Sequence, residues 1–374
     1  MSDAPPRTDG ALRAAPEWLS TLGTRSWLFV GILALLAAAS YLLTRSAAIV
    51  GPLLVAVILG ILCTPIVAML EHRGVPRAGG AGIVMLCVVA ILGALTWVMV
   101  SAFASNFGAM QKEAIAGIEA ARVLLASSQL PASLVDTIIS VSTKAAAAVS
   151  KVLLGGVAGI ADMVFAGFMA FYMLFYTLTD SDKLITWLGR HVGLTPKLGI
   201  EVVTDATESI RQYFMGTTIV ALGTSAATWL GLVVFHIPFA VPIAIVTFAT
   251  SYIPYLGVVI ATIFTALLAL GAGGVPMMIT ALIIVILVQN VLEAPLVGWA
   301  VGSALELHPL AVITSTLLGG VFGGMWGALL ASPLLAIGVR TNARLKAAKE
   351  GALGADEFGD AQDTALVEQA PATS

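Results

Sequence analysis

Long apolar runs separated by shorter polar stretches dominate the pattern along this chain. A helix needs about 20 apolar residues to cross the hydrocarbon core of a bilayer. Runs of roughly this length or longer predict about eight hydrophobic segments, at residues 27–43, 48–70, 81–103, 152–178, 214–235, 239–270, 275–292 and 309–339. We therefore predict an all-α integral membrane protein, in which one or two segments could be re-entrant hairpins instead of full crossings. The first three segments, within residues 27–103, form an N-terminal group.

Two stretches between these segments show amphipathic helical spacing instead of continuous apolar character. Residues 104–151 form the first of these inserts, and residues 180–213 form the second. In the second insert, Asp180 or Ser181 is a candidate helix cap, and Pro196 divides the insert into two pieces. We expect the two inserts to pack against each other in an oligomer or to gate a pore.

Composition supports the membrane interpretation and excludes several other classes. The chain is 59% hydrophobic and 10% charged, whereas soluble domains are about 45–50% apolar and about 25% charged. Lys and Arg occur singly, without the basic patch of a nucleic-acid-binding protein. Cys63 and Cys87 lie inside apolar runs and are predicted to be free thiols. Because no nucleotide-binding loop, zinc motif or nucleophile motif is present in the sequence, we expect neither enzymatic activity nor a cofactor.

The distribution of Lys and Arg predicts which side of the membrane each connection faces. With an even number of crossings, most of the 18 Lys and Arg residues lie on the side that holds both termini. We therefore place the tails, residues 1–26 and 341–374, in the cytoplasm. The insert at 104–151 would then be extracytoplasmic, and the insert at 180–213 cytoplasmic.

The segments 239–270 and 309–339 are each interrupted near their middle by proline or glycine. Each also follows a simpler apolar helix, so residues 214–340 suggest a weak internal repeat, although two apolar stretches could match by chance. Paired interrupted segments are the best sequence indication of a binding site in a transporter. We therefore interpret residues 214–340 as a transport core, and the sequence leaves open whether each interrupted segment crosses or re-enters.

The motifs of this region resemble those of the AI-2E (autoinducer-2 exporter) family. The matching strings are Tyr213-Phe214-Met215-Gly216, Ile237-Pro238-Phe239-Ala240, Ile253-Pro254-Tyr255-Leu256-Gly257, Gln289-Asn290-Val291-Leu292-Glu293-Ala294-Pro295-Leu296-Val297-Gly298, Leu307-His308-Pro309-Leu310 and Gly324-Met325-Trp326-Gly327. Ala294 departs from the pattern, because family members often have proline directly after the glutamate. The resemblance covers about residues 30–340. It implies a homo-oligomeric permease of a bacterial cytoplasmic (inner) membrane, which exports the quorum-sensing signal autoinducer-2 or exchanges Na+ or Li+ for protons.

Polar residues at the end of segment 275–292 are the first candidate site. Glu293 follows a very apolar run, with Gln289 and Asn290 close before it. An ionisable group at membrane depth usually marks function, because burying it is unfavourable. Asn290 and Glu293 are three positions apart and are predicted to share a helix face. They could coordinate a cation, accept a proton or bind a polar solute; alternatively, Glu293 orients a loop at the membrane surface.

The interruption of segment 239–270 is the second candidate site. Pro254 and Gly257 break the helix and would free backbone groups for a ligand. Ser251 and Tyr252 are the candidate contacts, and a purely structural kink is the alternative.

Glycine, histidine and aspartate at other positions suggest further roles. Three glycines spaced by four residues predict close helix packing, with a loop that lines the solute path as the alternative: Gly319, Gly323 and Gly327. His236 and His308 hold matching positions before the interrupted segments and are interpreted as anchors at the membrane surface. Asp162 lies inside segment 152–178 and receives no role.

These observations favour a transporter or exporter of a small polar solute, such as an autoinducer-2-like signal, which protons could drive. One alternative is a Na+(Li+)/H+ antiporter, which needs a titrating carboxylate such as Glu293 or Asp162. Another is a non-transporting oligomeric membrane scaffold whose working parts are the inserts. The expected partners are membrane lipid, a polar solute and/or a monovalent cation or proton, and further copies of the chain. Nucleic acid is not an expected partner.

Overall fold

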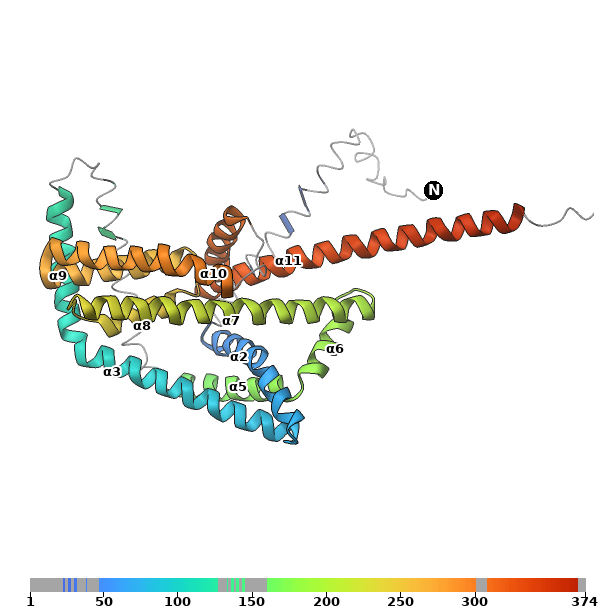
Figure 1. Cartoon of the computed structure of the whole chain (residues 1–374), viewed down its shortest axis with the longest axis horizontal. Helices are drawn as coiled ribbons and strands as arrows, with labels where there is room; N and C mark the ends of the chain where they lie inside the picture. The colour runs from blue at the N-terminus through green and yellow to red at the C-terminus, as the bar shows by residue number, and fades with distance from the viewer. Residues whose placement is uncertain are drawn as a thin grey trace, which may run out of the picture.

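The computed structural model describes residues 47–126, 160–300 and 308–368, with scattered residues of 23–38 and 133–144. These parts form helices and contain no strand (Figure 1). The helices are α2 (Ala47–His72), α3 (Arg77–Ala126), α5 (Ile160–Thr179), α6 (Ser181–His191), α7 (Pro196–Val234), α8 (Ala240–Thr250), α9 (Leu256–Leu287), the π-helix η3 (Val288–Glu293), α10 (Ala294–Ala300) and α11 (Pro309–Glu368). Among the described helices, 5 are long and apolar enough to cross a membrane. The predicted all-α membrane fold is therefore confirmed.

Helices α2, α3 and α5 pack through one cluster of buried apolar side chains, which includes Ala56, Val84 and Leu174. Most of segment 27–43 lies outside the described residues. The segment 81–103 continues without interruption into the insert that follows it, because no proline stops the helix, and α3 reaches 50 residues. Figure 1 shows α3 turning sharply at the end of the molecule remote from α6.

The insert at 180–213 is a helical hairpin whose second arm continues into the apolar segment 214–235. Pro196 begins α7, as predicted, and α7 runs for 39 residues through the segment 214–235. The two arms meet at Gly189 and Gly199, because a Cβ on Gly199 would collide with the carbonyl oxygen of Gly189. This close backbone contact fixes how α6 is rotated against α7.

The segment 239–270 is a helical hairpin of two unequal arms. Helix α8 has 11 residues and is therefore about 16 Å long, roughly half the 30 Å hydrocarbon core. A non-helical break at residues 251–255 follows, and α9 then returns. Ile243 of α8 and Leu268 of α9 share one buried cluster, so the start of α8 lies beside the far part of this arm of α9.

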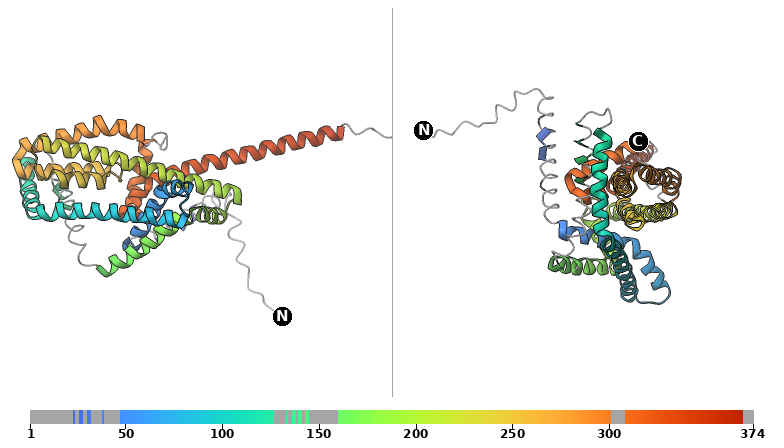
Figure 2. Two further views of the ribbon diagram at one scale, coloured as in Figure 1. Left: turned by 60° about the horizontal axis from the view of Figure 1, so that its bottom comes forward. Right: turned by 90° about the vertical axis from the view of Figure 1, so that its left-hand side faces the viewer.

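Helix α9 is itself two arms that meet at a sharp turn. Gly273 and Gly274 leave helical geometry there, and Gly274 has φ 70°, a conformation that glycine adopts without steric conflict. Val258 and Val288 lie at similar distances along the chain from this turn, and both line the same pocket. The two arms are therefore antiparallel, as the turned view shows (Figure 2).

Helix α11 contains the second interruption. Gly324 has φ 58° and separates two arms. Gly319 and Gly327 face each other across this turn, because a Cβ on either would meet the other's backbone carbonyl. Beyond it, α11 continues through most of the predicted tail at 341–374 and extends away from the other helices (Figure 1).

Replacing Gly327 by alanine is expected to lower the free energy of unfolding by about 1–3 kcal/mol, the usual range for inserting a methyl group into a packed site. The collision is with backbone atoms of Gly319, which no side-chain rotation can relieve. Gly323→Ala is the matched control, since nothing lies within 4 Å of its Cβ position. Denaturation in detergent micelles measures the difference, and equal stability of both variants would contradict the close approach of the two arms.

Candidate functional site

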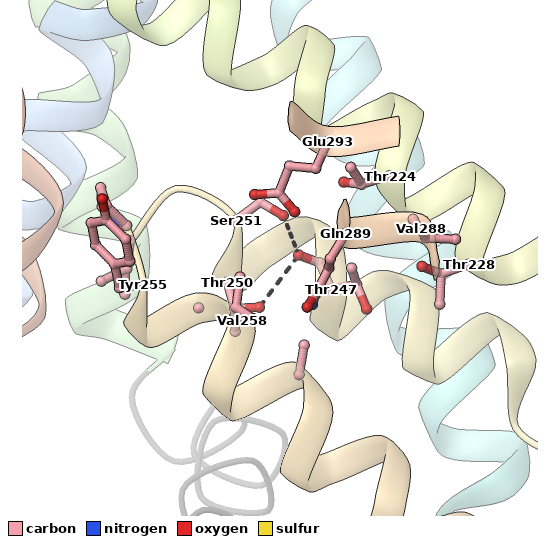
Figure 3. A pocket seen from close by; sticks show the side chains of 14 residues that line it. Thr224, Thr228, Thr247, Thr250, Ser251, Tyr255, Val258, Val288, Gln289 and Glu293 are labelled. Carbon is pink, nitrogen blue, oxygen red and sulfur yellow. Dashed lines mark hydrogen bonds between the residues drawn. The ribbon is translucent and has the colours of Figure 1, made fainter. Parts of the chain in front are cut away.

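A polar pocket lies where the break at residues 251–255 meets the end of α9 (Figure 3). Its cavity volume is about 50 Å³. That is room for an ion or a few water molecules, far below the roughly 300 Å³ at which sites for organic ligands begin. The lining residues are Thr224, Thr228, Thr247, Thr250, Ser251, Ile253, Pro254, Tyr255, Gly257, Val258, Ala261, Val288, Gln289 and Glu293.

Hydroxyl groups of the pocket act as hydrogen-bond acceptors toward its interior. Thr224, Thr247, Thr250 and Ser251 each donate to the backbone carbonyl four residues earlier, at 2.9, 2.9, 2.8 and 2.6 Å. A hydroxyl has one proton and two lone pairs, so the proton is already used and only acceptor positions remain. The end of α8 and the start of α9 both face the break, so their opposite dipole charges offset one another. The side chains therefore decide which charge the pocket attracts.

Glu293 brings a carboxylate to this acceptor-rich pocket. It ends the π-helix η3, a winding that occurs often at functional sites. The side chain is partly buried, and Figure 3 shows its carboxylate pointing toward the hydroxyl of Ser251. No ion pair involves Glu293 among the described residues. One negative charge among oxygen acceptors suits a single monovalent cation or a proton.

The π-helical winding changes which residues share a face. Asn290 is exposed, donates from Nδ2 to the carbonyl of Ile286 at 2.8 Å, and does not line the pocket. Gln289 does line it, together with Glu293. A π-helix bonds residue i to i+5 and has more residues per turn than an α-helix, so positions four apart align more closely than positions three apart. The structure therefore joins Glu293 to Gln289 and separates it from Asn290.

Tyr252 also lies apart from the polar pocket. Its hydroxyl is 3.0 Å from that of Thr218, and its ring stands edge-on to Phe248. It lines a separate, largely apolar cavity between α2, α7 and α11. Of the contacts expected at the break, Ser251 faces the polar pocket and Tyr252 does not.

The break is held in a tight and strained form. Gly257 packs directly on the backbone of Thr250, so that a Cβ there would collide with the Thr250 carbonyl oxygen. Tyr255, which also lines the pocket, has φ 63°, a conformation that costs a non-glycine residue of order 1–3 kcal/mol. Strain of this kind concentrates at functional sites.

Sequence reasoning missed the contribution of α7. Thr224 and Thr228 are almost fully buried, at 3% and 2% exposure, and both line the pocket. Their spacing of four residues places both on one helix face. They lie in a stretch with no Asp, Glu, Lys or Arg between Gln212 and Leu292. Two threonines four residues apart in such a stretch could have indicated a polar site on this helix.

The remaining predicted residues lie elsewhere. Gly319 and Gly327 form the close contact within α11, whereas nothing lies within 4 Å of the Cβ position of Gly323. His308 accepts a hydrogen bond from the backbone of Leu310 at the start of α11. Asp162 is in α5, and its side chain lies outside the described part of the structure.

Comparison with known proteins gives consistent matches. A family model described as "AI-2E family transporter" matches residues 30–346. "Putative transport protein MT0215" of Mycobacterium tuberculosis is 29% identical over 348 residues, which cover 90% of this chain and 92% of that protein. "Putative transport protein YhhT" of Escherichia coli K12 is 25% identical over 300 residues, 78% of this chain and 83% of that protein. "Putative permease PerM" of Escherichia coli K12 is 23% identical over 187 residues, 50% of this chain and 53% of that protein.

Proposed function

The chain belongs to the AI-2E family of transporters, and on this premise we propose that it is a cation-coupled secondary transporter whose coupling ion binds at Glu293. It is a multi-pass membrane protein, and its relatives carry the names of transport proteins and permeases. The observation that carries the proposal is the pocket, where one carboxylate stands among hydroxyls whose protons are already donated. Na+ and Li+ prefer such hard oxygen ligands, as other hard cations do.

Coupling follows from competition at a single carboxylate. A proton on Glu293 removes the negative charge that holds a metal cation, so a proton and Na+ exclude each other from the pocket. If the pocket opens alternately to each side of the membrane, this exclusion exchanges Na+ for H+. The break at residues 251–255 and the turn at Gly273 and Gly274 are the non-helical points at which such a movement can bend the chain.

Export of a small polar solute driven by protons is the second candidate. The amide of Gln289 and the pocket hydroxyls are groups that bind sugar-like molecules, which is the class of an autoinducer-2-like signal. At about 50 Å³ the cavity would have to enlarge several-fold to hold such a solute. The closed pocket therefore favours the smaller ligand, a monovalent cation.

The proposal is tested with purified protein in vesicles that contain a pH-sensitive dye. An inward Na+ gradient should change the internal pH, and an equal K+ gradient should change it less. A pH change on addition of autoinducer-2, without one on addition of Na+, would favour the proton-driven exporter. If internal pH stays constant with Na+, Li+ and autoinducer-2, cation coupling is contradicted and the non-transporting scaffold is favoured.

Replacing Ser251 by alanine is expected to raise the Na+ concentration for half-maximal response about 10-fold. The change removes one oxygen ligand, and a hydrogen-bond-like contact contributes about 1–1.5 kcal/mol. Ser105→Ala on α3 is the matched control, because Ser105 makes the same kind of bond to the carbonyl of Ser101, at 2.7 Å, far from the pocket. If Ser251→Ala and the control show the same Na+ dependence, Ser251 is not a ligand of the cation.

A further inference from the structure

Helix α6 presents an apolar stripe that no described residue covers. Leu184, Trp187, Leu188 and Val192 are 37%, 60%, 45% and 46% exposed. Their spacing of three and four residues places the first three on one face of α6, and Val192 extends that face just past its C-terminus. Gly189, on another side of α6, is buried against Ile200 of α7.

Basic side chains run along one edge of this stripe. Lys183 and Arg190 are seven positions apart and line a shallow groove with Asp182, Thr186, Trp187 and His191. The Trp187 and His191 rings lie 4.8 Å apart. The groove therefore joins an apolar rim to two cationic groups and an indole.

The acidic groups near this groove are already paired with cations. Asp182 accepts a hydrogen bond from Arg77 at 2.6 Å. Asp180 pairs with Lys183 at 2.8 Å, but the Lys183 side chain is 82% exposed, and an exposed pair of this kind is weak. Lys197, exposed at the start of α7, adds a further cation beyond the C-terminus of α6. The groove therefore attracts anions.

The position of α6 in the chain places it at the membrane boundary. Helix α5 is an apolar helix that ends at Thr179, and a single residue, Asp180, separates it from α6. Figure 1 shows α6 slanting from the end of α5 to the start of α7, beside the turn between α2 and α3. The contact of Gly189 with Gly199 fixes the rotation of α6 about its axis. The apolar stripe therefore has a fixed orientation relative to α7.

We propose that α6 is an interfacial helix that binds anionic phospholipid. Leu184 and Leu188 insert among the acyl chains, and Trp187 lies at the level of the headgroups, where tryptophan is enriched in membrane proteins. Lys183 and Arg190 bind the phosphate of the headgroup. Helix α6 thus combines an apolar face that inserts with basic residues beside it. Helices that lie in the surface of an anionic membrane have this same combination.

The test uses the full chain in lipid nanodiscs, with Cys63 and Cys87 replaced by alanine and Leu188→Cys labelled with a fluorophore. Brominated lipids should quench this label strongly. Thr186→Cys is the matched control, because Thr186 lies at the edge of the groove farther from Leu188. It should be quenched at least 2-fold less, roughly the contrast expected between groups inside and outside the acyl region. Equal quenching at both positions would overturn the proposal.

The charge dependence is measured in the same nanodiscs. Brominated phosphatidylglycerol should outcompete brominated phosphatidylcholine by about 5-fold near the label, the effect that one basic residue has at an anionic surface. Lys183→Gln combined with Arg190→Gln should bring this preference close to unity while the label stays quenched. A preference that persists in the double variant would overturn the role of these two side chains. Disulfide formation between Leu188→Cys residues of two copies, without quenching, would show that a second copy covers the stripe instead.

Discussion

Replacing Gly257 by alanine is expected to weaken cation-driven transport strongly and to destabilise the protein. The added methyl group would collide with the carbonyl oxygen of Thr250, a backbone atom at the end of α8 that cannot rotate away. Insertion of a methyl group into a packed site costs about 1–3 kcal/mol. Because Thr250 and Gly257 both line the pocket, the distortion falls directly on the site. If it falls on the cation-bound state, affinity drops roughly 10- to 100-fold.

Two measurements separate this effect from a general loss of folding. The vesicle assay gives the Na+ response, and thermal unfolding in detergent gives the stability of the same sample. Gly93→Ala in α3 is the matched control, since nothing lies within 4 Å of that Cβ position, and it should keep both properties. Normal transport by Gly257→Ala would mean that the break does not shape the site.

Much of the fold could be predicted because the solvent of this protein is lipid. Hydropathy then reports burial in the membrane almost directly, and α2 matches its predicted segment closely. Proline and glycine marked two further boundaries. Pro196 begins α7, and the turn at Gly273 and Gly274 falls in the gap left between two predicted segments.

Helix continuity could not be predicted from the same pattern. An amphipathic helix and an apolar helix share one period of 3.6 residues, so a change from one to the other leaves no backbone signal. This is why α3 continues past residue 103 and α7 joins an insert to a crossing. Asp205, in the insert at 180–213, has a partner that the sequence did not indicate. Arg344 of α11 pairs there with Asp205.

Some residues proposed from the sequence line one pocket in the structure, among them Ser251, Gln289 and Glu293, whereas others do not. The prediction that Asn290 and Glu293 share a face assumes α-helical winding. In the π-helix η3, Gln289 lines the pocket with Glu293, as proposed, and Asn290 does not. The sequence between Val288 and Glu293 contains no signal that predicts a π-helix. Thr224 and Thr228 were missed for another reason, because a pocket between distant helices depends on tertiary packing.

Replacing Glu293 by glutamine is expected to abolish the exchange of Na+ for protons while leaving the fold intact. Glutamine keeps the size of the side chain but carries no charge and cannot titrate. Because no described residue forms an ion pair with Glu293, its neutralisation leaves no cation unpaired there, and thermal stability should be unchanged. Loss of a charged ligand weakens Na+ binding by about 1.5–3 kcal/mol, or roughly 10- to 100-fold in the dissociation constant for Na+. Proton movement should disappear altogether.

Two companion variants determine how this result is interpreted. Glu119→Gln on α3, exposed and remote from the pocket, should behave like the unchanged protein. Glu293→Asp retains a carboxylate on a shorter side chain, so it should keep proton coupling with weaker Na+ binding. If Glu293→Gln still moves protons in response to Na+, the coupling site lies elsewhere in the chain. If it instead passes autoinducer-2 down its own gradient without proton movement, Glu293 is the proton carrier of an exporter, and competition with Na+ is not its role.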